Sequence, residues 1–187
     1  EGANVFVTLE DLARTMGRTY AGEAFTASRA GTFPNGVHLA EIEIDPETGA
    51  LDLLRYTVVD DVGTVVNPAG LAGQIHGGVA QGLGQAFGER IVYDADGALL
   101  SGSLMDYALP RAADLTMMDL HHSPTETHAN AVGAKGVGES GVVGALAAGI
   151  SAVQDALAPF GVTRIDMPAT PHRVWQAIQA AQQGETS

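Results

Sequence analysis

VHLAEIEIDPETGALDLLRYTVVD, residues 37–60, decides how this chain begins to fold. Its first part, Val37–Asp45, alternates apolar residues with glutamates, and a period of two is typical of a half-buried strand. The DPETG turn that follows has proline early and glycine late, as tight turns do. The last part, Leu51–Asp60, is rich in Leu, Val, Thr and Tyr, which favour strands. The stretch predicts an antiparallel hairpin.

Helices are expected on both sides of this hairpin. A short one is predicted at Leu9–Met16. Asn67-Pro68 provides a capping side chain followed by a proline in the first turn, so a helix should run from there to about Phe87. Apolar residues at steps of three and four predict a helix over 142–158. Thr170-Pro171 begins a last helix that ends near Gly184.

Shorter signals complete the expected fold. Ile91–Tyr93 and Leu99–Leu104 flank a turn and indicate a second hairpin, and a further strand is possible at Thr116–His121. Hairpins and helices without a βαβ rhythm indicate the α+β class. We therefore expect antiparallel hairpins packed with a glycine-rich helix and two C-terminal helices.

Composition excludes several functions. A net charge of -13 argues against nucleic acid and anionic membranes as partners. The absence of cysteine excludes disulfides, thiolate zinc sites and cysteine-held iron–sulfur clusters on this chain, and it fits the cytoplasm. We expect no run of membrane-spanning length. The chain opens without methionine or a basic leader, so we expect it to be part of something longer.

Seven glycines lie in or beside the predicted helix at 68–87, and each interior one costs about 1 kcal/mol relative to alanine. Glycine's benefit is close approach, either of another helix or of a ligand. Both explanations stay open at this point. The amide of Gln74, early in the helix, can donate and accept hydrogen bonds and so suits the edge of a large heterocyclic cofactor.

A second glycine cluster, Gly133–Gly141, leads into the predicted helix at 142–158. Glycines at a helix start leave N–H groups free to hold an anion. The cluster contains G-x-G-x-x-G, but no buried strand is expected before it, so we discount a dinucleotide fold. Glu139 is a candidate general base, or a glutamate placed by the helix dipole. Lys135, the only lysine, is a candidate cofactor contact or a solvated side chain.

Other polar residues give weaker signals. His121 and His122 are adjacent, so on a strand they point to opposite faces, and no carboxylate completes a ligand spacing with them and His128. We therefore predict no metal ligands on this chain. The Asp60-Asp61 pair could bind a cation or simply end a strand.

Several motifs in order resemble one family over nearly the whole chain. They are Thr32–His38 (TFPNGVH), Asp45–Gly49 (DPETG), Asp61–Pro68 (DVGTVVNP), Gly73–Gly84 (GQIHGGVAQGLG), Ala134–Glu139 (AKGVGE) and Pro168–Trp175 (PATPHRVW). This pattern resembles the C-terminal end of the large subunits of the xanthine dehydrogenase family of molybdenum hydroxylases, and most of all its carbon monoxide dehydrogenase-like branch.

The resemblance implies a mechanism. In that family the matching glutamate, Glu139 here, deprotonates a metal-bound hydroxyl, whose oxygen attacks an electrophilic carbon while hydride passes to a sulfido ligand. The cofactor is molybdenum–molybdopterin, commonly in the cytosine dinucleotide form in bacteria. We expect its contacts at the residues that follow: Gln74, Gly77, Gly78, Lys135, Gly136, Val137, Gly138 and Glu139.

The resemblance also implies partners. Residues 1–187 would form the C-terminal part of a molybdopterin-binding domain, with a lead-in at 1–35 and a cofactor-contacting core at 36–187. Iron–sulfur clusters and FAD would sit on partner subunits of a cytoplasmic hetero-oligomer, and the rest of the large subunit would be needed for activity. Carbon monoxide, aldehydes and N-heterocycles remain open as substrates. The rival hypothesis is a non-catalytic remnant that acts as a binding or scaffold module.

Overall fold

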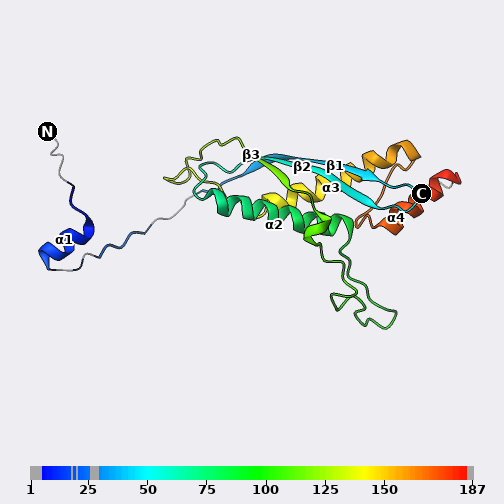
Figure 1. Ribbon diagram of the computed structural model, residues 1–187, viewed down its shortest axis with the longest axis horizontal. Coiled ribbons are helices and arrows are strands. Elements are labelled where there is room, and N and C mark those ends of the chain that lie inside the picture. The colour runs from blue at the N-terminus through cyan, green and yellow to red at the C-terminus, as the bar shows by residue number, and fades with distance from the viewer. Residues whose placement is uncertain (1–5, 18, 20, 26–29, 185–187) are drawn as a thin grey trace.

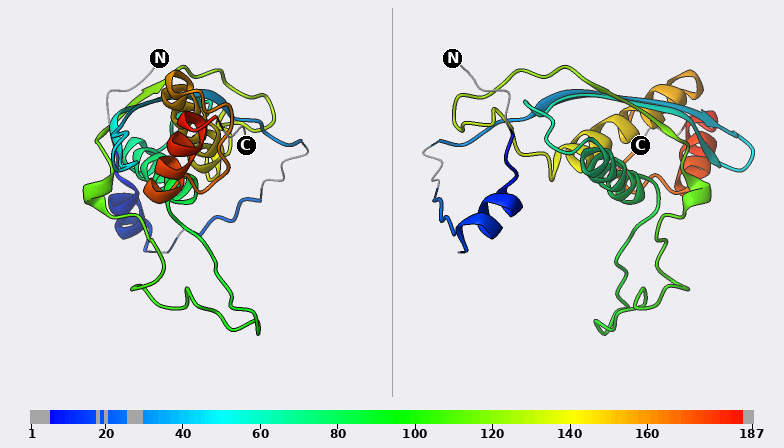
Figure 2. Two further views of the ribbon diagram at one scale, coloured as in Figure 1. Left: turned by 90° about the vertical axis from the view of Figure 1, so that its right-hand side faces the viewer. Right: turned by 60° about the vertical axis from the view of Figure 1, so that its left-hand side comes forward.

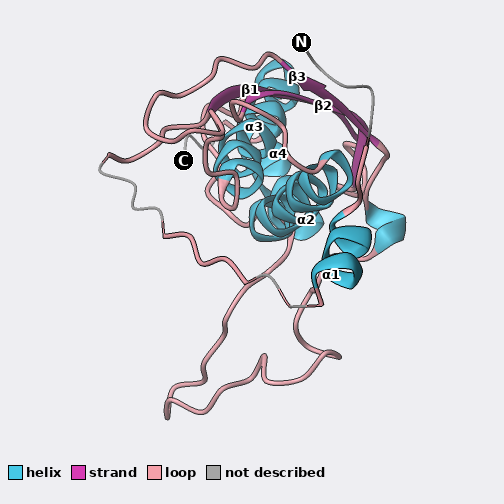
Figure 3. Ribbon diagram, turned by 90° about the vertical axis from the view of Figure 1, so that its left-hand side faces the viewer, coloured by secondary structure: helices cyan, strands magenta, loops and turns pink. Residues whose placement is uncertain are grey.

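A computed structural model describes residues 6–17, 19, 21–25 and 30–184. A curved three-stranded sheet, ordered β1-β2-β3, lies over two packed helices, α2 and α3 (Figures 1 and 3). The bounds of the α-helices and strands are α1 Leu9–Met16, β1 Asn35–Ile44, β2 Leu51–Asp61, α2 Pro68–Phe87, β3 Met118–His122, α3 Ser140–Leu157 and α4 Pro171–Gln182. Short 3₁₀ turns lie at Ala112–Asp114 and Ala158–Phe160. The α+β class is confirmed.

The first hairpin is confirmed. β1 and β2 pair antiparallel from Asn35 opposite Asp61 to Ile44 opposite Leu51, with a bulge after Glu41. The turn depends on Gly49, whose φ of 73° is costly for other residues. A methyl group there would also lie 2.0 Å from the Pro171 carbonyl oxygen, so the turn is fitted closely against the start of α4.

The second predicted hairpin is confirmed only around its turn, where the Leu100 N–H donates to the Val92 carbonyl oxygen and the Asp94 N–H donates to the Ala98 carbonyl oxygen. Within residues 89–111 the described pairing is one isolated bridge between Tyr93 and Leu99, and the segment extends away from the body (Figure 2). A two-stranded ribbon without a covering layer is marginal in water, and Leu104 and Met105 of this arm are 77% and 96% exposed. The possible strand near Thr116 is confirmed as β3, which pairs parallel to β2.

Glycine–glycine contact joins α2 to α3. A methyl group on Gly78 would lie 3.0 Å from the Gly141 Cα atom, and one on Gly82 would lie 2.7 Å from the Ala145 Cβ atom. By contrast, a methyl group on Gly73 or on its neighbour Gly77 would meet no described atom within 4 Å. Helix packing therefore explains some of these glycines, and the others leave the helix backbone bare.

Two apolar clusters stabilise the body. One lies between the sheet and α2 and includes Tyr56, Ile75 and Leu83, all buried. The other lies where α3 meets α4 and includes Val153 and Ile178. α1 contributes no buried residue and stands apart from this body (Figure 1).

The expectation about membrane-spanning length needs correction. Ser140–Phe160 is long and apolar enough to cross a membrane, judged by length and composition alone. Core helices pass the same test, and α3 packs against α2 through Gly141, Ala145 and Gly149. Its apolar residues therefore have a role in the fold of this chain.

Candidate active site

A nearly buried ion pair holds the second glycine cluster against the sheet. Lys135 Nζ lies 2.8 Å from Asp61 Oδ2, and both side chains are 10% exposed. The other oxygen, Asp61 Oδ1, accepts hydrogen bonds from the N–H groups of Gly63 and Thr125, each at 2.9 Å. Lys135 is therefore not a solvated side chain, and its amine is engaged within the protein.

The charge state of Asp61 follows from these contacts. The hydrogen bond from Lys135, helped by the N–H groups of Thr125 and Gly63, lowers the pKa of the Asp61 carboxyl far below its ordinary value. The Asp61 carboxyl thus stays ionised at neutral pH. Asp61 ends β2 as expected, but its carboxylate also connects the strand end to two loops.

Gln74 and the second glycine cluster meet in one pocket of about 210 Å³, here called the Gln74 pocket. Its lining is Val62, Thr64, Val65, Val66, Asn67, Gly70, Leu71, Gln74, Ala134, Lys135 and Val137. Among the described residues nothing hydrogen-bonds to the Gln74 amide, which is exposed. The cluster and the early part of α2 are thus brought together as the sequence predicted.

The glycines of this cluster leave backbone accessible. Methyl groups at Gly136 and Gly138 would meet no described atom within 4 Å. The Gly136 N–H donates to Thr32 Oγ1 at 3.1 Å, while no described acceptor receives the N–H groups of Val137 and Gly138. The cluster therefore presents N–H donors without described acceptors, those of Val137 and Gly138 among them. Gly78 instead faces α3, so close helix packing also explains the glycine at this predicted cofactor-contacting position.

Glu139 occupies the N-cap position of α3 but does not cap it. No capping hydrogen bond from its side chain is present, and Glu139 is exposed on this chain. It lines a second pocket of about 310 Å³, the Glu139 pocket, with Pro34, Asn35, Gly36, His38, Asp60, Ser140, Val143 and Gly144. Glu139 therefore lines a different pocket from Gln74, although it follows Val137 of the Gln74 pocket by only two positions in the sequence.

His38 and Asp60 line the Glu139 pocket, although sequence reasoning assigned His38 no role and offered Asp60 only as a possible cation ligand or strand end. His38 shares the inward face of β1 with Ala40, Ile42 and Ile44, so its place in the alternation was an available signal. The side chains of His38 and Asp60 are 5% and 2% exposed, and His38 Nε2 lies 3.6 Å from Asp60 Oδ1.

The remaining candidates are dispersed. His121, His122 and His128 are exposed, and no group of three or more His, Asp or Glu residues suited to a metal occurs in the described part of the chain. Before Gly136 the chain makes only an isolated bridge between Ala134 and Gly63. That context does not provide the strand that a dinucleotide-binding fold requires.

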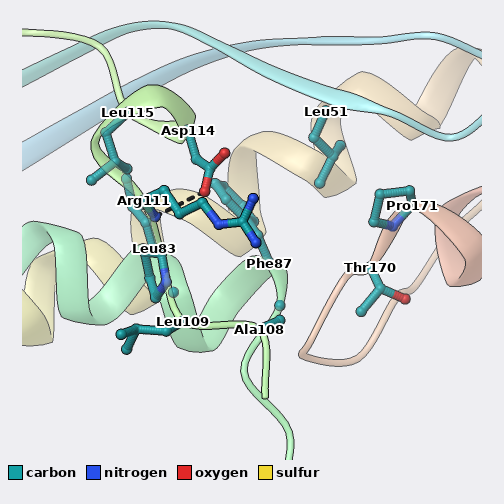
Figure 4. A pocket seen from close by; sticks show the side chains of 13 residues that line it. Leu51, Leu83, Phe87, Ala108, Leu109, Arg111, Asp114, Leu115, Thr170 and Pro171 are labelled. Carbon is teal, nitrogen blue, oxygen red and sulfur yellow. Dashed lines mark hydrogen bonds between the residues drawn. The ribbon is translucent and has the colours of Figure 1, made fainter. Parts of the chain in front are cut away.

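A third, apolar pocket of about 480 Å³ lies at the far end of α2, around Phe87 (Figure 4). Arg111 reaches over it, and the Arg111 N–H donates to Asp114 Oδ2 at 2.8 Å. None of the predicted site residues lines this pocket.

Comparison with known proteins identifies the family of this chain. Residues 4–116 match the molybdopterin cofactor-binding domain. The carbon monoxide dehydrogenase large chain of Hydrogenophaga pseudoflava is 42% identical over 79% of this chain, and the nicotine 6-hydroxylase large subunit of Paenarthrobacter nicotinovorans is 41% identical over 79%. This chain spans 18% of each relative.

Solved structures show the same fold. CO dehydrogenase from Oligotropha carboxidovorans superposes with a TM-score of 0.77 at 34% identity, over 81% of this chain and 19% of that one. Quinoline 2-oxidoreductase from Pseudomonas putida 86 gives 0.76 at 40% identity, over 78% and 19%. The chain belongs to the molybdopterin cofactor-binding family of the xanthine dehydrogenase-type molybdenum hydroxylases, in its carbon monoxide dehydrogenase-like branch.

Proposed function

We propose that this chain forms the cofactor-facing part of a molybdenum hydroxylase large subunit, with Glu139 as its general base. One observation carries the proposal. The Lys135–Asp61 pair holds the second glycine cluster beside Gln74, and the same cluster ends on a carboxylate that makes no capping contact.

The residues present fit a pterin cofactor. A pterin is a flat heterocycle with donors and acceptors on its edge, and Gln74 offers both from an amide that has no described partner. The free N–H groups of Val137 and Gly138 suit oxygen acceptors or phosphate. Gly77 leaves the face of α2 without a side chain, which admits a close-lying ring.

When bound, the molybdenum cofactor supplies the oxidation of a substrate carbon with water-derived oxygen. Glu139 acts as a general base: it takes up one proton at its carboxylate and must release that proton before the next turnover. Lys135 keeps the cluster in place through Asp61, because the amine is already bound there. In this arrangement Lys135 contributes cofactor contact through its backbone and stem rather than its charge.

The finer features are also proposals. The cytosine dinucleotide form of the cofactor is favoured by the resemblance. Without cysteine, this chain cannot itself hold an iron–sulfur cluster through thiolates. The resemblance favours such clusters, with FAD, on other subunits of a cytoplasmic hetero-oligomer. One relative is itself a subunit of a 6-hydroxypseudooxynicotine dehydrogenase complex. Carbon monoxide, an aldehyde or an N-heterocycle would be the small substrate, and 1–35 would serve as a lead-in to a cofactor-contacting core at 36–187.

Gln74→Ala in the complete assembled protein tests the cofactor site. Losing one or two hydrogen bonds should lower retention of molybdenum and pterin about 2- to 10-fold, measured by metal analysis and pterin fluorescence. Gln85→Ala is the matched control, because Gln85 is an exposed glutamine of the same helix outside the Gln74 pocket. Retention in Gln74→Ala equal to that in Gln85→Ala would contradict the part given to Gln74, whereas a wild-type assembly without molybdenum or pterin would favour the non-catalytic scaffold.

A further inference from the structure

Three buried polar side chains, Tyr56, His38 and Asp60, form a row next to Glu139 and have no part in the function proposed so far. β2 brings Tyr56 and Asp60 to the inward face of the sheet, on either side of His38 in β1, because Tyr56 pairs with Ala40 and Asp60 with Gly36. The His38 ring packs against Gly144 of α3, where a methyl group would lie 2.6 Å from the ring atoms. A glycine is therefore required for the histidine to fit.

A hydrogen bond joins His38 to Tyr56. The Tyr56 hydroxyl lies 2.8 Å from His38 Nδ1. Burial, together with the nearby Asp60 charge, raises the pKa of Tyr56, so the phenol keeps its proton. When Tyr56 donates to Nδ1, the ring proton sits on Nε2 and faces Asp60 Oδ1 at 3.6 Å.

One atom of this row has no partner. Asp60 Oδ2 is buried, yet it accepts no hydrogen bond from the described residues. A buried carboxylate oxygen without a donor costs free energy unless water or a proton satisfies it. Asp60 lines the Glu139 pocket, which at about 310 Å³ has room for several waters. Asp60 and Glu139 are the acidic side chains of that lining, and His38 is its third titratable group.

We propose that Asp60 receives the proton that Glu139 collects, and that His38 is the positioning residue that holds Asp60 for this task. The O–H bond on Glu139 breaks, water in the Glu139 pocket carries the proton across, and a new O–H bond forms at Asp60 Oδ2. Asp60 then gives this proton to the same water, which passes it to bulk solvent before the next turnover. Glu139 is restored as a carboxylate for the next turnover, and no electrons move in this step. This inference rests on the proposed role of Glu139.

The first experiment asks whether the groups share one electrostatic site, and it needs no turnover. Hydrogen–deuterium exchange at the Cε1 atom of His38, followed by mass spectrometry, gives the pH midpoint of its imidazole in the complete protein. Removing a neighbouring negative charge disfavours imidazolium, so Glu139→Gln should lower that midpoint by about 0.5 pH unit or more. Glu43→Gln, on the exposed side of β1, should leave it unchanged. An unmoved midpoint in Glu139→Gln overturns the inference.

The second experiment separates proton removal from chemistry. In Asp60→Asn of the cofactor-loaded protein, the rate of a single turnover should stay within about 2-fold of wild type. Repeated turnover should fall by about 10-fold or more, and its solvent deuterium effect should rise. The substrate is whichever of carbon monoxide, an aldehyde or quinoline is turned over. Equal losses in both rates would mean that Asp60 is only structural, whereas full turnover in Glu139→Gln would instead defeat the proposed function.

Discussion

Lys135 Nζ and Asp61 Oδ2 lie 2.8 Å apart, although 74 positions separate these residues along the chain. The pair joins the end of β2 to the second glycine cluster, and both side chains are 90% covered. Because the same carboxylate also binds the N–H groups of Gly63 and Thr125, three segments converge on it. The geometry of the candidate site depends on this junction.

Breaking the junction should loosen the cluster and weaken the fold at neutral pH, where Asp61 is ionised. Lys135→Met removes the amine, so we expect a lower melting temperature and faster amide exchange over 133–141. Lys135→Arg keeps a positive charge, so its melting temperature and amide exchange should lie between those of Lys135→Met and wild type. Since the folded state lowers the pKa of Asp61, its stabilisation is present above the unfolded value of about 3.9 and is lost as pH falls below it.

Denaturant unfolding between pH 6 and pH 2 measures this effect. In Asp61→Asn the loss of stability on acidification should be smaller than in wild type, because the carboxylate that takes up the proton is gone. Parallel pH curves for the two proteins would contradict the role given to the pair.

The glycines of α2 should respond oppositely to alanine. Gly82→Ala forces a methyl group to within 2.8 Å of the Val142 carbonyl oxygen, so the free energy of unfolding should fall by about 1–3 kcal/mol. Gly73→Ala meets open space on this chain and gains helix propensity, up to about 1 kcal/mol. Denaturant titration of cofactor-free protein compares them. A Gly82→Ala protein as stable as wild type would refute the α2–α3 packing.

Tyr56 should control stability at alkaline pH. Its folded pKa is raised, so its contribution is intact below the unfolded value of about 10 and is lost as pH rises above it. Tyr56→Phe loses the hydrogen bond to His38, at a cost of about 0.5–1.5 kcal/mol near neutrality, but should lose less stability than wild type between pH 9 and pH 11. Ultraviolet titration of tyrosinate checks the assignment, and ionisation of Tyr56 near pH 10 in folded protein would contradict it.

Local patterns predicted the elements that depend on local chemistry. β1 forms where Val37–Asp45 alternates apolar and polar residues. α2 and α4 begin directly after the predicted caps, Asn67 and Thr170. In the arm at 89–111 only the turn of the predicted hairpin forms, because turn residues predict a reversal of the chain but not whether another layer packs over its strands. The parallel pairing of β3 with β2 is set by tertiary contacts that no local window contains.

The site was predictable only in part. The two glycine clusters pointed to Gln74 and Glu139, and the structure brings Gln74 against the loop that leads to Glu139. The Lys135–Asp61 pair and the His38–Asp60 contact join distant strands and loops, so residue spacing cannot reveal them. For Lys135, a lone lysine suggested a ligand contact, whereas its amine is engaged by Asp61.

Glu139→Gln in the complete assembled protein tests the central claim most directly. The substitution keeps the shape of an exposed side chain that makes no capping bond, so folding, molybdenum content and pterin content should match wild type. Loss of the base should lower kcat by about 10²- to 10⁴-fold with carbon monoxide, an aldehyde or quinoline, whichever is turned over. Wild-type turnover by a Glu139→Gln protein that carries its full cofactor would contradict the account.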